Sequence, residues 1–376
     1  METREMKTIG TTPSLLGMGC MRFPLQEDGT IDVAQTQEMM DYALANGVTY
    51  IDTAYFYHNG ESEGVVGEIL AKYDRSSYTL ATKLPVWTMK DASDTRKIFE
   101  DQLQKLRTDY IDYYLLHNLS AKSWQAVKDY GLISILEELR AEGKIKYIGF
   151  SFHDEYEVFE DIIKYYKWDF CQIQFNYMDT EEQAGLKGYQ LADELGIPLV
   201  VMEPVRGGAL AKLSDDMEEK FKSINPEESI ASYALRYVAS YPNVKVILSG
   251  MSNLEQVKDN VATFSPLRPL SQEEIMAIQE VRVALEERIQ NGCTGCEYCM
   301  PCPHGVNIPQ NFKLWNTYHM YQNYEPIRFP MMNLPKRSQA DKCVGCGLCE
   351  AKCPQHIKIS EDMPKVWADL SNPIWK

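Results

Sequence analysis

Short apolar segments alternate with longer amphipathic segments through about the first 265 residues of the chain. The apolar segments have the length of buried strands, and the segments between them carry apolar residues at helical spacing. Clear examples of predicted helices are Thr95–Leu106 and Trp124–Ala141. Eight strands are predicted, over Leu15–Gly19, Val48–Ala54, Tyr78–Lys83, Tyr110–His117, Tyr147–Ser151, Phe170–Phe175, Pro198–Glu203 and Val244–Gly250.

This alternation, repeated eight times, predicts an α/β fold of the closed parallel (β/α)8 type, the TIM barrel. The alternative is a doubly wound open sheet. No Gly-x-Gly-x-x-Gly follows an early strand, which argues against a dinucleotide-binding domain of that kind. A length of 376 residues suits a barrel with a smaller appendage.

The appendage is predicted to begin near residue 285. Ser271 and Glu274 have the spacing of a capping box, which opens a helix that leads directly to Cys293. We therefore expect a barrel domain over residues 1–285 and a smaller, α-helical iron–sulfur domain over residues 286–376. The helix has an apolar face made of Ile275, Ile278, Val281, Leu285 and Ile289.

The chemistry of the appendage is indicated by its cysteines, because eight of the ten in the chain form two runs there. Each run ends in a proline and is similar to the runs of bacterial two-cluster ferredoxins, so two 4Fe–4S clusters are predicted. In those ferredoxins the fourth cysteine of each run ligates the other cluster. One cluster is then expected on Cys293, Cys296, Cys299 and Cys353, and the other on Cys343, Cys346, Cys349 and Cys302.

Two other uses of these cysteines, a zinc site and disulfides, fit the pattern less well. Zinc ribbons usually take two separated Cys-x-x-Cys pairs, and disulfides need an oxidising compartment. One departure from the ferredoxin pattern is that two residues, not three, precede Cys302 in its run. Between the runs, a helix predicted over Gln310–Tyr324 carries aromatic residues that pack the module or line the substrate mouth.

The net charge of the chain limits the kinds of partner that it is expected to bind. A formal net charge of −16 disfavours binding to nucleic acid or to anionic membranes. No apolar run approaches the roughly 18 residues of a membrane span, and the N-terminal METREMKTIG lacks the apolar core of a signal peptide. A cytoplasmic protein is predicted.

Polar side chains gather at the ends of three consecutive predicted strands. Asp52, with Tyr57 five residues later, follows the second strand, Lys83 ends the third and His117 ends the fourth. Because a (β/α)8 barrel performs its chemistry at the carboxyl ends of its strands, the four side chains are expected at one mouth.

Residues 50–63, YIDTAYFYHNGESE, resemble the active-site strand and following helix of the aldo-keto reductases. The resemblance spans roughly residues 7–262, and the cysteine-rich tail resembles the branch of the family with a C-terminal ferredoxin-like domain. It implies a catalytic tetrad of Asp52, Tyr57, Lys83 and His117. Tyr55 is a rival for the acid, but its offset from Asp52 does not match the family.

The residue types account for the implied reaction. A nicotinamide delivers hydride to a carbonyl carbon while Tyr57 protonates the oxygen. Lys83 would lower the pKa of Tyr57, Asp52 would hold Lys83 in place, and His117 would orient the carbonyl.

The resemblance also implies cofactor contacts. Ser151 and Gln172 match residues that hold the nicotinamide carboxamide, although Phe152 stands where the family has Asn. Met202 stands where the family has an aromatic residue that stacks on the nicotinamide ring, so a flavin stays open as an alternative cofactor. NADP and NAD both remain open, because the cations that grip a 2′-phosphate are absent. The other expected contacts are Arg206 at the pyrophosphate and Ser252, Gln256 and Asn260 at the adenosine.

The predicted function is hydride transfer between a nicotinamide and a small-molecule carbonyl or alcohol, with iron–sulfur clusters for electron transfer or for structure. An alternative from another class is an electron-carrier or regulatory subunit, whose barrel senses nucleotide and whose clusters serve a redox partner protein. A nucleic-acid-linked iron–sulfur protein is disfavoured by the net charge.

Overall fold

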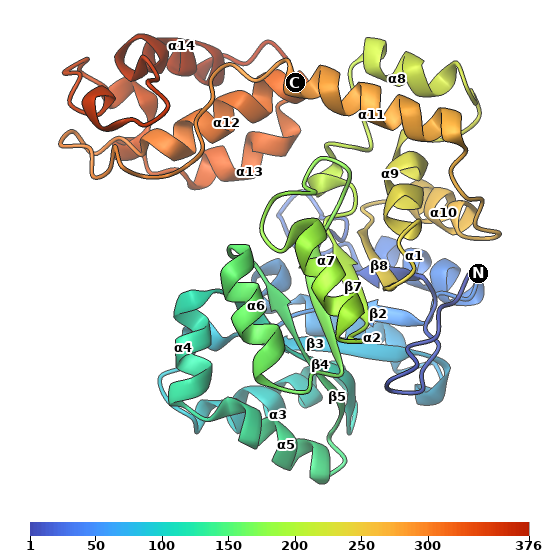
Figure 1. Cartoon of the computed structure of the whole chain (residues 1–376). Coiled ribbons are helices and arrows are strands. Elements are labelled where there is room, and N and C mark those ends of the chain that lie inside the picture. The colour runs from blue at the N-terminus through green and yellow to red at the C-terminus, as the bar shows by residue number, and fades with distance from the viewer. Residues whose placement is uncertain (376) are drawn as a thin grey trace. The chain divides into compact units, whose positions relative to one another are not determined.

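The computed structural model describes residues 1–375, which form two compact units (Figure 1). The barrel unit comprises Met1–Val205 and Ala231–Leu270, and the helical unit comprises Arg206–Ile230 and Ser271–Lys376. The chain thus enters the helical unit once between two barrel segments. The sequence-based boundary near residue 285 stays a prediction about where the two modules meet along the chain.

The barrel unit is built on eight parallel strands that close in the order of the chain, so the predicted (β/α)8 fold is confirmed. Each predicted strand is present, with bounds shifted by a few residues. The strands are β1 Leu16–Gly19, β2 Tyr50–Asp52, β3 Thr79–Leu84, β4 Ile111–Leu119, β5 Ile145–Phe152, β6 Phe170–Gln174, β7 Leu199–Met202 and β8 Val244–Gly250.

Helices of the barrel unit connect the strands (Figure 1). The single helix predicted over Trp124–Ala141 is wrong, because Gly131 adopts a left-handed conformation with φ of 61° and divides it into α4 and α5. The helices are α1 Val33–Ala45, α2 Ser62–Leu70, α3 Asp94–Leu106, α4 Ala121–Asp129, α5 Leu132–Ala141, α6 Tyr156–Tyr165, α7 Gly185–Glu194, α9 Ile230–Ala239 and α10 Leu254–Thr263.

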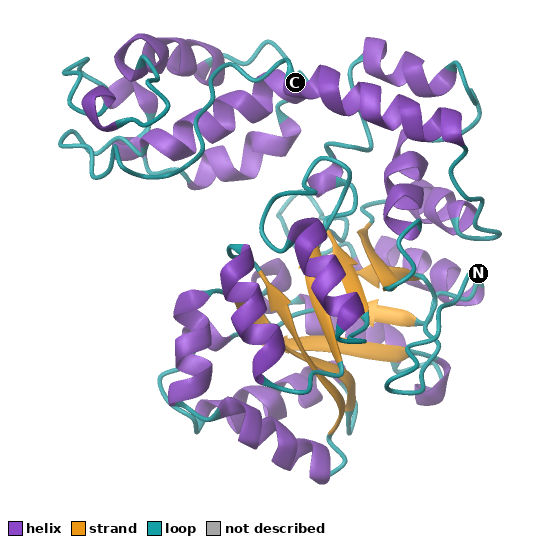
Figure 2. Ribbon diagram, viewed as in Figure 1, coloured by secondary structure: helices purple, strands orange, loops and turns teal. Residues whose placement is uncertain are grey.

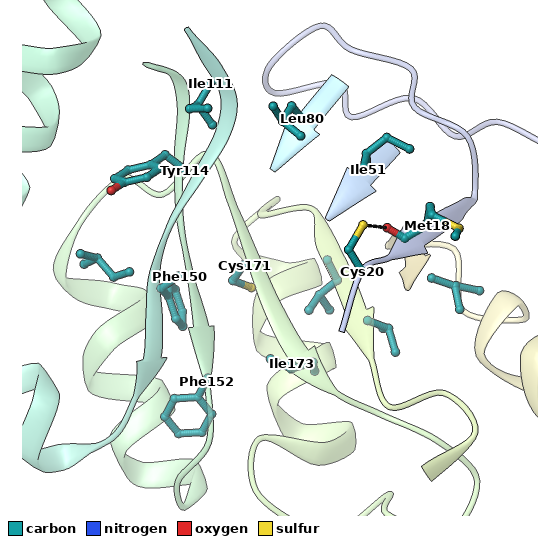
Figure 3. Packing of buried hydrophobic residues seen from close by; sticks show 14 of the residues in the cluster. Met18, Cys20, Ile51, Leu80, Ile111, Tyr114, Phe150, Phe152, Cys171 and Ile173 are labelled. Carbon is teal, nitrogen blue, oxygen red and sulfur yellow. Dashed lines mark hydrogen bonds between the residues drawn. The ribbon is translucent and has the colours of Figure 1, made fainter. Parts of the chain in front are cut away.

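Two apolar layers stabilise the barrel unit. The larger one packs the helices onto the outside of the strands and includes Cys20 and Cys171, both fully buried (Figure 3). The smaller layer includes Tyr50, Tyr113 and Phe170, with Met6 of the N-terminal segment. The two cysteines therefore behave as small apolar side chains.

The helical unit is made of helices and long loops, and all eight strands lie in the barrel unit (Figure 2). The predicted capping box of Ser271 and Glu274 is present at the start of α11. Two helices after the predicted aromatic helix, α13 and α14, were not predicted. The helices are α8 Asp215–Lys222, α11 Gln272–Glu286, α12 Ile308–Tyr321, α13 Glu325–Asn333 and α14 Ile359–Ser371.

Aromatic side chains of α12 form the core of the helical unit. Phe312, Trp315 and Tyr318 are buried with Met363 and Val366 of α14, and most of the cysteines of both runs pack against this cluster. The aromatic helix therefore serves as a packing surface, which was one of the two roles expected for it.

Candidate active site

The predicted tetrad lies at the carboxyl ends of adjacent strands. Asp52 ends β2, Lys83 lies near the end of β3 and His117 lies near the end of β4. Tyr57 opens a short 3-10 helix, Tyr57–Gly60, that follows β2. The register of β2 with β3 and of β3 with β4 sets these ends side by side.

Lys83 is the centre of the tetrad. Its Nζ donates to Asp52 Oδ1 and to the Thr53 carbonyl oxygen, both at 2.7 Å, and lies 3.4 Å from Tyr57 Oη. Burial alone would lower the pKa of Lys83, but Asp52 and Tyr57 outweigh burial and raise it. Lys83 is therefore an ammonium at neutral pH, with all three of its protons directed at acceptors.

Tyr57 keeps its proton at neutral pH. Burial raises the pKa of Tyr57, and the opposing effect of Lys83 only reduces that rise. The expectation that Lys83 leaves Tyr57 with a lowered pKa is thus incomplete, because the sequence does not show how deeply the phenol is buried. A protonated phenol is the form that can donate to a carbonyl oxygen.

His117 faces the same site as a neutral imidazole. Burial, with a smaller contribution from the Lys83 charge, lowers its pKa well below the ordinary value for histidine. Among the described residues its Nδ1 has no hydrogen-bond partner. Its ring lies edge-on to Tyr57 at 6.1 Å and to Trp87 at 4.9 Å between centroids.

Three predicted cofactor residues lie on β5, β6 and β7. Ser151 is in register with Gln172, and Gln172 Nε2 donates to Met202 Sδ at 3.3 Å. Gln172 is buried, and its carbonyl oxygen has no partner among the described residues. A buried, unpaired amide oxygen can accept from the carboxamide of a nicotinamide, so this group of residues fits that cofactor.

The residues expected at the adenosine lie around the start of α10. The Ser252 backbone N–H donates to Gln256 Oε1 at 2.8 Å, which orders the loop before the helix. Asn260 is buried, and its Nδ2 donates to Ser249 Oγ at 2.7 Å. Asn260 thus supports the end of β8, whereas Ser252 and Gln256 form the loop itself.

Arg206, expected at a pyrophosphate, has partners inside the helical unit. Its Nη1 donates to Tyr321 Oη at 2.6 Å, and its guanidinium lies 5.6 Å from the centroid of the Tyr321 ring. A role for Arg206 toward nucleotide stays a prediction.

The cysteines of the first predicted cluster line one pocket of the helical unit. Cys293, Cys296, Cys299 and Cys353 surround it together with apolar side chains such as Phe312. This is the set that combines three cysteines of the first run with the last of the second. In residues 1–375, no group of three or more His, Cys, Asp or Glu side chains is arranged so that it could hold a metal ion.

Burial also affects the protonation of these thiols. It raises the pKa of Cys293, and it raises that of Cys299 to about 11. Because a metal ligand must be a thiolate, binding of iron at this pocket would release protons.

The model of the Aldo/keto reductase family matches residues 15–283, which is most of the chain. The chain belongs to this family. A second model, for a 4Fe-4S dicluster domain, matches residues 292–357 of this aldo/keto reductase. No helix among its described residues is both long and apolar enough to cross a membrane.

Two relatives of this chain are named as an oxidoreductase and a reductase. This aldo/keto reductase family member is 27% identical over 310 residues to the uncharacterized oxidoreductase YqkF of Bacillus subtilis, covering 74% of this chain and 96% of that protein. It is 28% identical over 288 residues to the NADH-specific methylglyoxal reductase of Escherichia coli, covering 64% and 85%.

Solved structures show the same barrel. The holo form of the aldo-keto reductase AKR11C1 from Bacillus halodurans is 28% identical, with a TM-score of 0.63 over 74% of this chain and 96% of that one. An aldo-keto reductase from Klebsiella pneumoniae in complex with NADPH is 21% identical, with a TM-score of 0.62 over 75% and 96%, and it shows the fold alone.

Sequence reasoning missed several residues of this aldo/keto reductase's site. Phe56 and Trp87 lie 6.0 Å apart between ring centroids, beside His117, and are 45% and 49% exposed. Behind the tetrad, Glu63 is fully buried against Thr82 and Gln102. A charged residue with 0% exposure is a signal that only the structure supplies.

Proposed function

We propose that the barrel unit transfers hydride between a nicotinamide and a small carbonyl or alcohol. The observation that carries the proposal is the position of Lys83, which contacts Asp52 and Tyr57 at once. That contact places a fixed positive charge beside the Tyr57 phenol, where it can stabilise the phenolate that remains after proton donation. The family membership of the chain supports the same reaction class.

In the reduction, the bound nicotinamide would supply hydride to the carbonyl carbon. Tyr57 donates its hydroxyl proton to the carbonyl oxygen as negative charge develops there. The resulting phenolate is stabilised by the Lys83 ammonium, 3.4 Å away, and Asp52 holds that ammonium in place. His117, neutral, has one ring N–H to donate to the same oxygen.

Ser151, Gln172 and Met202 would hold the nicotinamide, and Ser252, Gln256 and Asn260 would hold the adenosine. Both NAD and NADP remain candidates for this chain. The E. coli relative is named NADH-specific, and the K. pneumoniae structure contains NADPH.

The substrate is proposed to carry an apolar or aromatic group next to its carbonyl. Phe56 and Trp87 form an exposed aromatic pair beside His117. Aromatic side chains left half-exposed at a site gain free energy when a ligand covers them. A polyhydroxylated substrate would leave that pair without an apolar partner.

The helical unit is proposed to hold two 4Fe–4S clusters, on the two crossed sets of cysteines given above. The family model for a dicluster domain and the shared pocket of Cys293, Cys296, Cys299 and Cys353 support the assignment. Hydride carries two electrons and a cluster accepts one, so the clusters either pass electrons to a redox partner or stabilise the unit.

The test compares two tyrosines in anaerobically prepared protein with its clusters. Tyr57→Phe should abolish carbonyl-dependent oxidation of NADH or NADPH, with the dissociation constant of the nucleotide unchanged. Tyr55→Phe is the matched control, since Tyr55 lies under Lys105 and not beside Lys83, and it should retain turnover. Turnover kept by Tyr57→Phe and lost in Tyr55→Phe would move the acid to Tyr55.

The state of the clusters is followed by EPR in the same samples. Nucleotide oxidation that depends on the carbonyl, with silent clusters, would favour a reductase with structural clusters. Cluster reduction by the nucleotide would favour electron transfer between the cofactors.

A further inference from the structure

A buried carboxylate lies behind the strands that carry the tetrad. Glu63, in the first turn of α2, is 0% exposed, and its Oε1 accepts from Thr82 Oγ1 at 2.6 Å and from Gln102 Nε2 at 2.7 Å. Thr82 directly precedes Lys83 on β3. Because successive side chains of a strand point to opposite faces, Thr82 faces the helices while Lys83 faces the barrel interior.

Gln102 of α3 connects the carboxylate to Lys83 by a second route. Its Nε2 also donates to the Lys83 carbonyl oxygen at 3.1 Å, and its Oε1 accepts from Tyr114 Oη at 2.7 Å. Glu63, Thr82, Gln102 and Tyr114 are all 0% exposed. They come from α2, β3, α3 and β4, so one network fixes the backbone of β3 on both sides of the Thr82–Lys83 peptide.

Ser62, the residue before Glu63, contacts Thr53, which is another hydrogen-bond partner of Lys83. Ser62 Oγ lies 2.9 Å from Thr53 Oγ1 and donates to the Cys20 carbonyl oxygen at 3.0 Å. The carbonyl oxygen of Thr53 is one of the three acceptors of Lys83. The first turn of α2 therefore contacts the strand of Lys83 and the residue that receives one of its hydrogen bonds.

We propose that Glu63 is a positioning residue that holds Lys83 in the geometry needed to stabilise the Tyr57 phenolate. The inference rests on the proposed function of the tetrad, and it assigns Glu63 no contact with substrate. The proposed role requires a hydrogen-bond acceptor at the position of Glu63 Oε1, where Thr82 and Gln102 donate. Among the described residues Glu63 Oε2 has no hydrogen-bond partner, so a side-chain amide oxygen can replace the carboxylate.

The experiment compares Glu63→Leu, which has no acceptor, with Glu63→Gln, which keeps one. Glu63→Leu is expected to lower kcat by tenfold or more, since an error of about 1 Å in a catalytic group can cost about 100-fold. The dissociation constant of the nucleotide should not change. Glu63→Gln should stay within about threefold of the wild-type kcat. Glu61→Leu, two residues earlier and exposed, is the matched control and should not alter kcat.

A second readout does not depend on turnover. Reductive methylation followed by mass spectrometry reports how accessible each lysine is, and Lys83 is 0% exposed. Lys83 should be methylated several times faster in Glu63→Leu than in wild type, and as slowly as wild type in Glu63→Gln. This readout separates failure of the positioning role from failure of the proposed reaction, which would appear as a wild type without turnover.

Three results would overturn the proposal. They are wild-type kcat and methylation in Glu63→Leu, equal losses in Glu63→Leu and Glu63→Gln, or an equal loss in Glu61→Leu. If Glu63→Leu does not fold, Thr82→Val replaces it, since it removes one donor to Glu63 at almost constant volume. A lower kcat with unchanged nucleotide binding then supports the proposal, and an unchanged kcat rejects it.

Discussion

Lys83 and Asp52 form a fully enclosed ion pair, with 2.7 Å between Nζ and Oδ1 and side-chain exposures of 0% and 3%. Removing one partner of a buried pair leaves the other charge without compensation, which costs about 3–5 kcal/mol. Asp52→Asn should therefore lower the melting temperature of the protein and reduce kcat, because Lys83 loses the partner that fixes its position.

The surface pair of Lys72 and Asp41 is the control for Asp52→Asn. Its N–O distance is 2.8 Å, but its side chains are 40% and 37% exposed. Exposed pairs contribute under about 1 kcal/mol, so Asp41→Asn should leave the melting temperature and kcat nearly unchanged. Equal melting temperatures for the two variants would contradict the role given to Asp52.

The two directions of the reaction should differ in their pH dependence. Reduction needs the protonated Tyr57, and burial raises the pKa of that phenol above its ordinary value of about 10. The rate of carbonyl reduction should thus be flat between about pH 6 and 9, while alcohol oxidation, which needs the phenolate, should rise with pH. Lys83→Met should move the oxidation profile to still higher pH, since Lys83 lowers the pKa of Tyr57. Initial rates in both directions across this range are the measurement.

His117 should make the protein less stable in acid. Its pKa is lowered in the folded state, mainly by burial, and lies near 6.5 when the chain is unfolded. Below about pH 6.5 the unfolded chain binds a proton that the folded protein does not, so stability falls as the pH drops. His117→Gln should therefore show a smaller loss of melting temperature between about pH 7.5 and 5.5 than wild type. A loss at least as large in the variant would be the opposite result.

The crossed ligation predicts which cluster each cysteine supports. Cys353→Ser should remove the cluster of the pocket shared with Cys293, Cys296 and Cys299, although Cys353 belongs to the second run. Cys346→Ser should remove the other cluster. Iron analysis should fall from about eight to about four atoms per chain in either variant, and the EPR spectra of the remaining cluster should differ. Identical spectra from the two variants would mean that both cysteines bind the same cluster.

Much of the barrel could be predicted from the sequence, because each strand is a short apolar run and each following helix carries apolar residues at helical spacing. The same pattern predicted that Asp52, Lys83 and His117 lie near the ends of consecutive strands, and the resemblance to the aldo-keto reductases added Tyr57 and the catalytic roles. The break at Gly131 could not be predicted, because the helical pattern continues on both sides of a glycine whose φ is only visible in the structure.

The network of Glu63 could not be predicted for a different reason. Glu63, Thr82, Gln102 and Tyr114 come from four elements, and their contacts depend on how α2 and α3 pack on the strands. In the sequence each is an ordinary polar residue. The pKa of Tyr57 was missed for the same reason, since burial is a property of the whole fold.

The order of the two units along the chain affects how the protein folds while it is being translated. Residues Arg206–Ile230, with α8, leave the ribosome before β8 and belong to the helical unit, whose other helices are made last. Met217 and Phe221 of α8 are buried in the finished protein. Until α11 is translated, these side chains lack the helix they pack beside, so the nascent chain exposes apolar surface after the eight strands of the barrel are complete. A version cut at residue 270 would keep that surface permanently and is expected to be prone to aggregation.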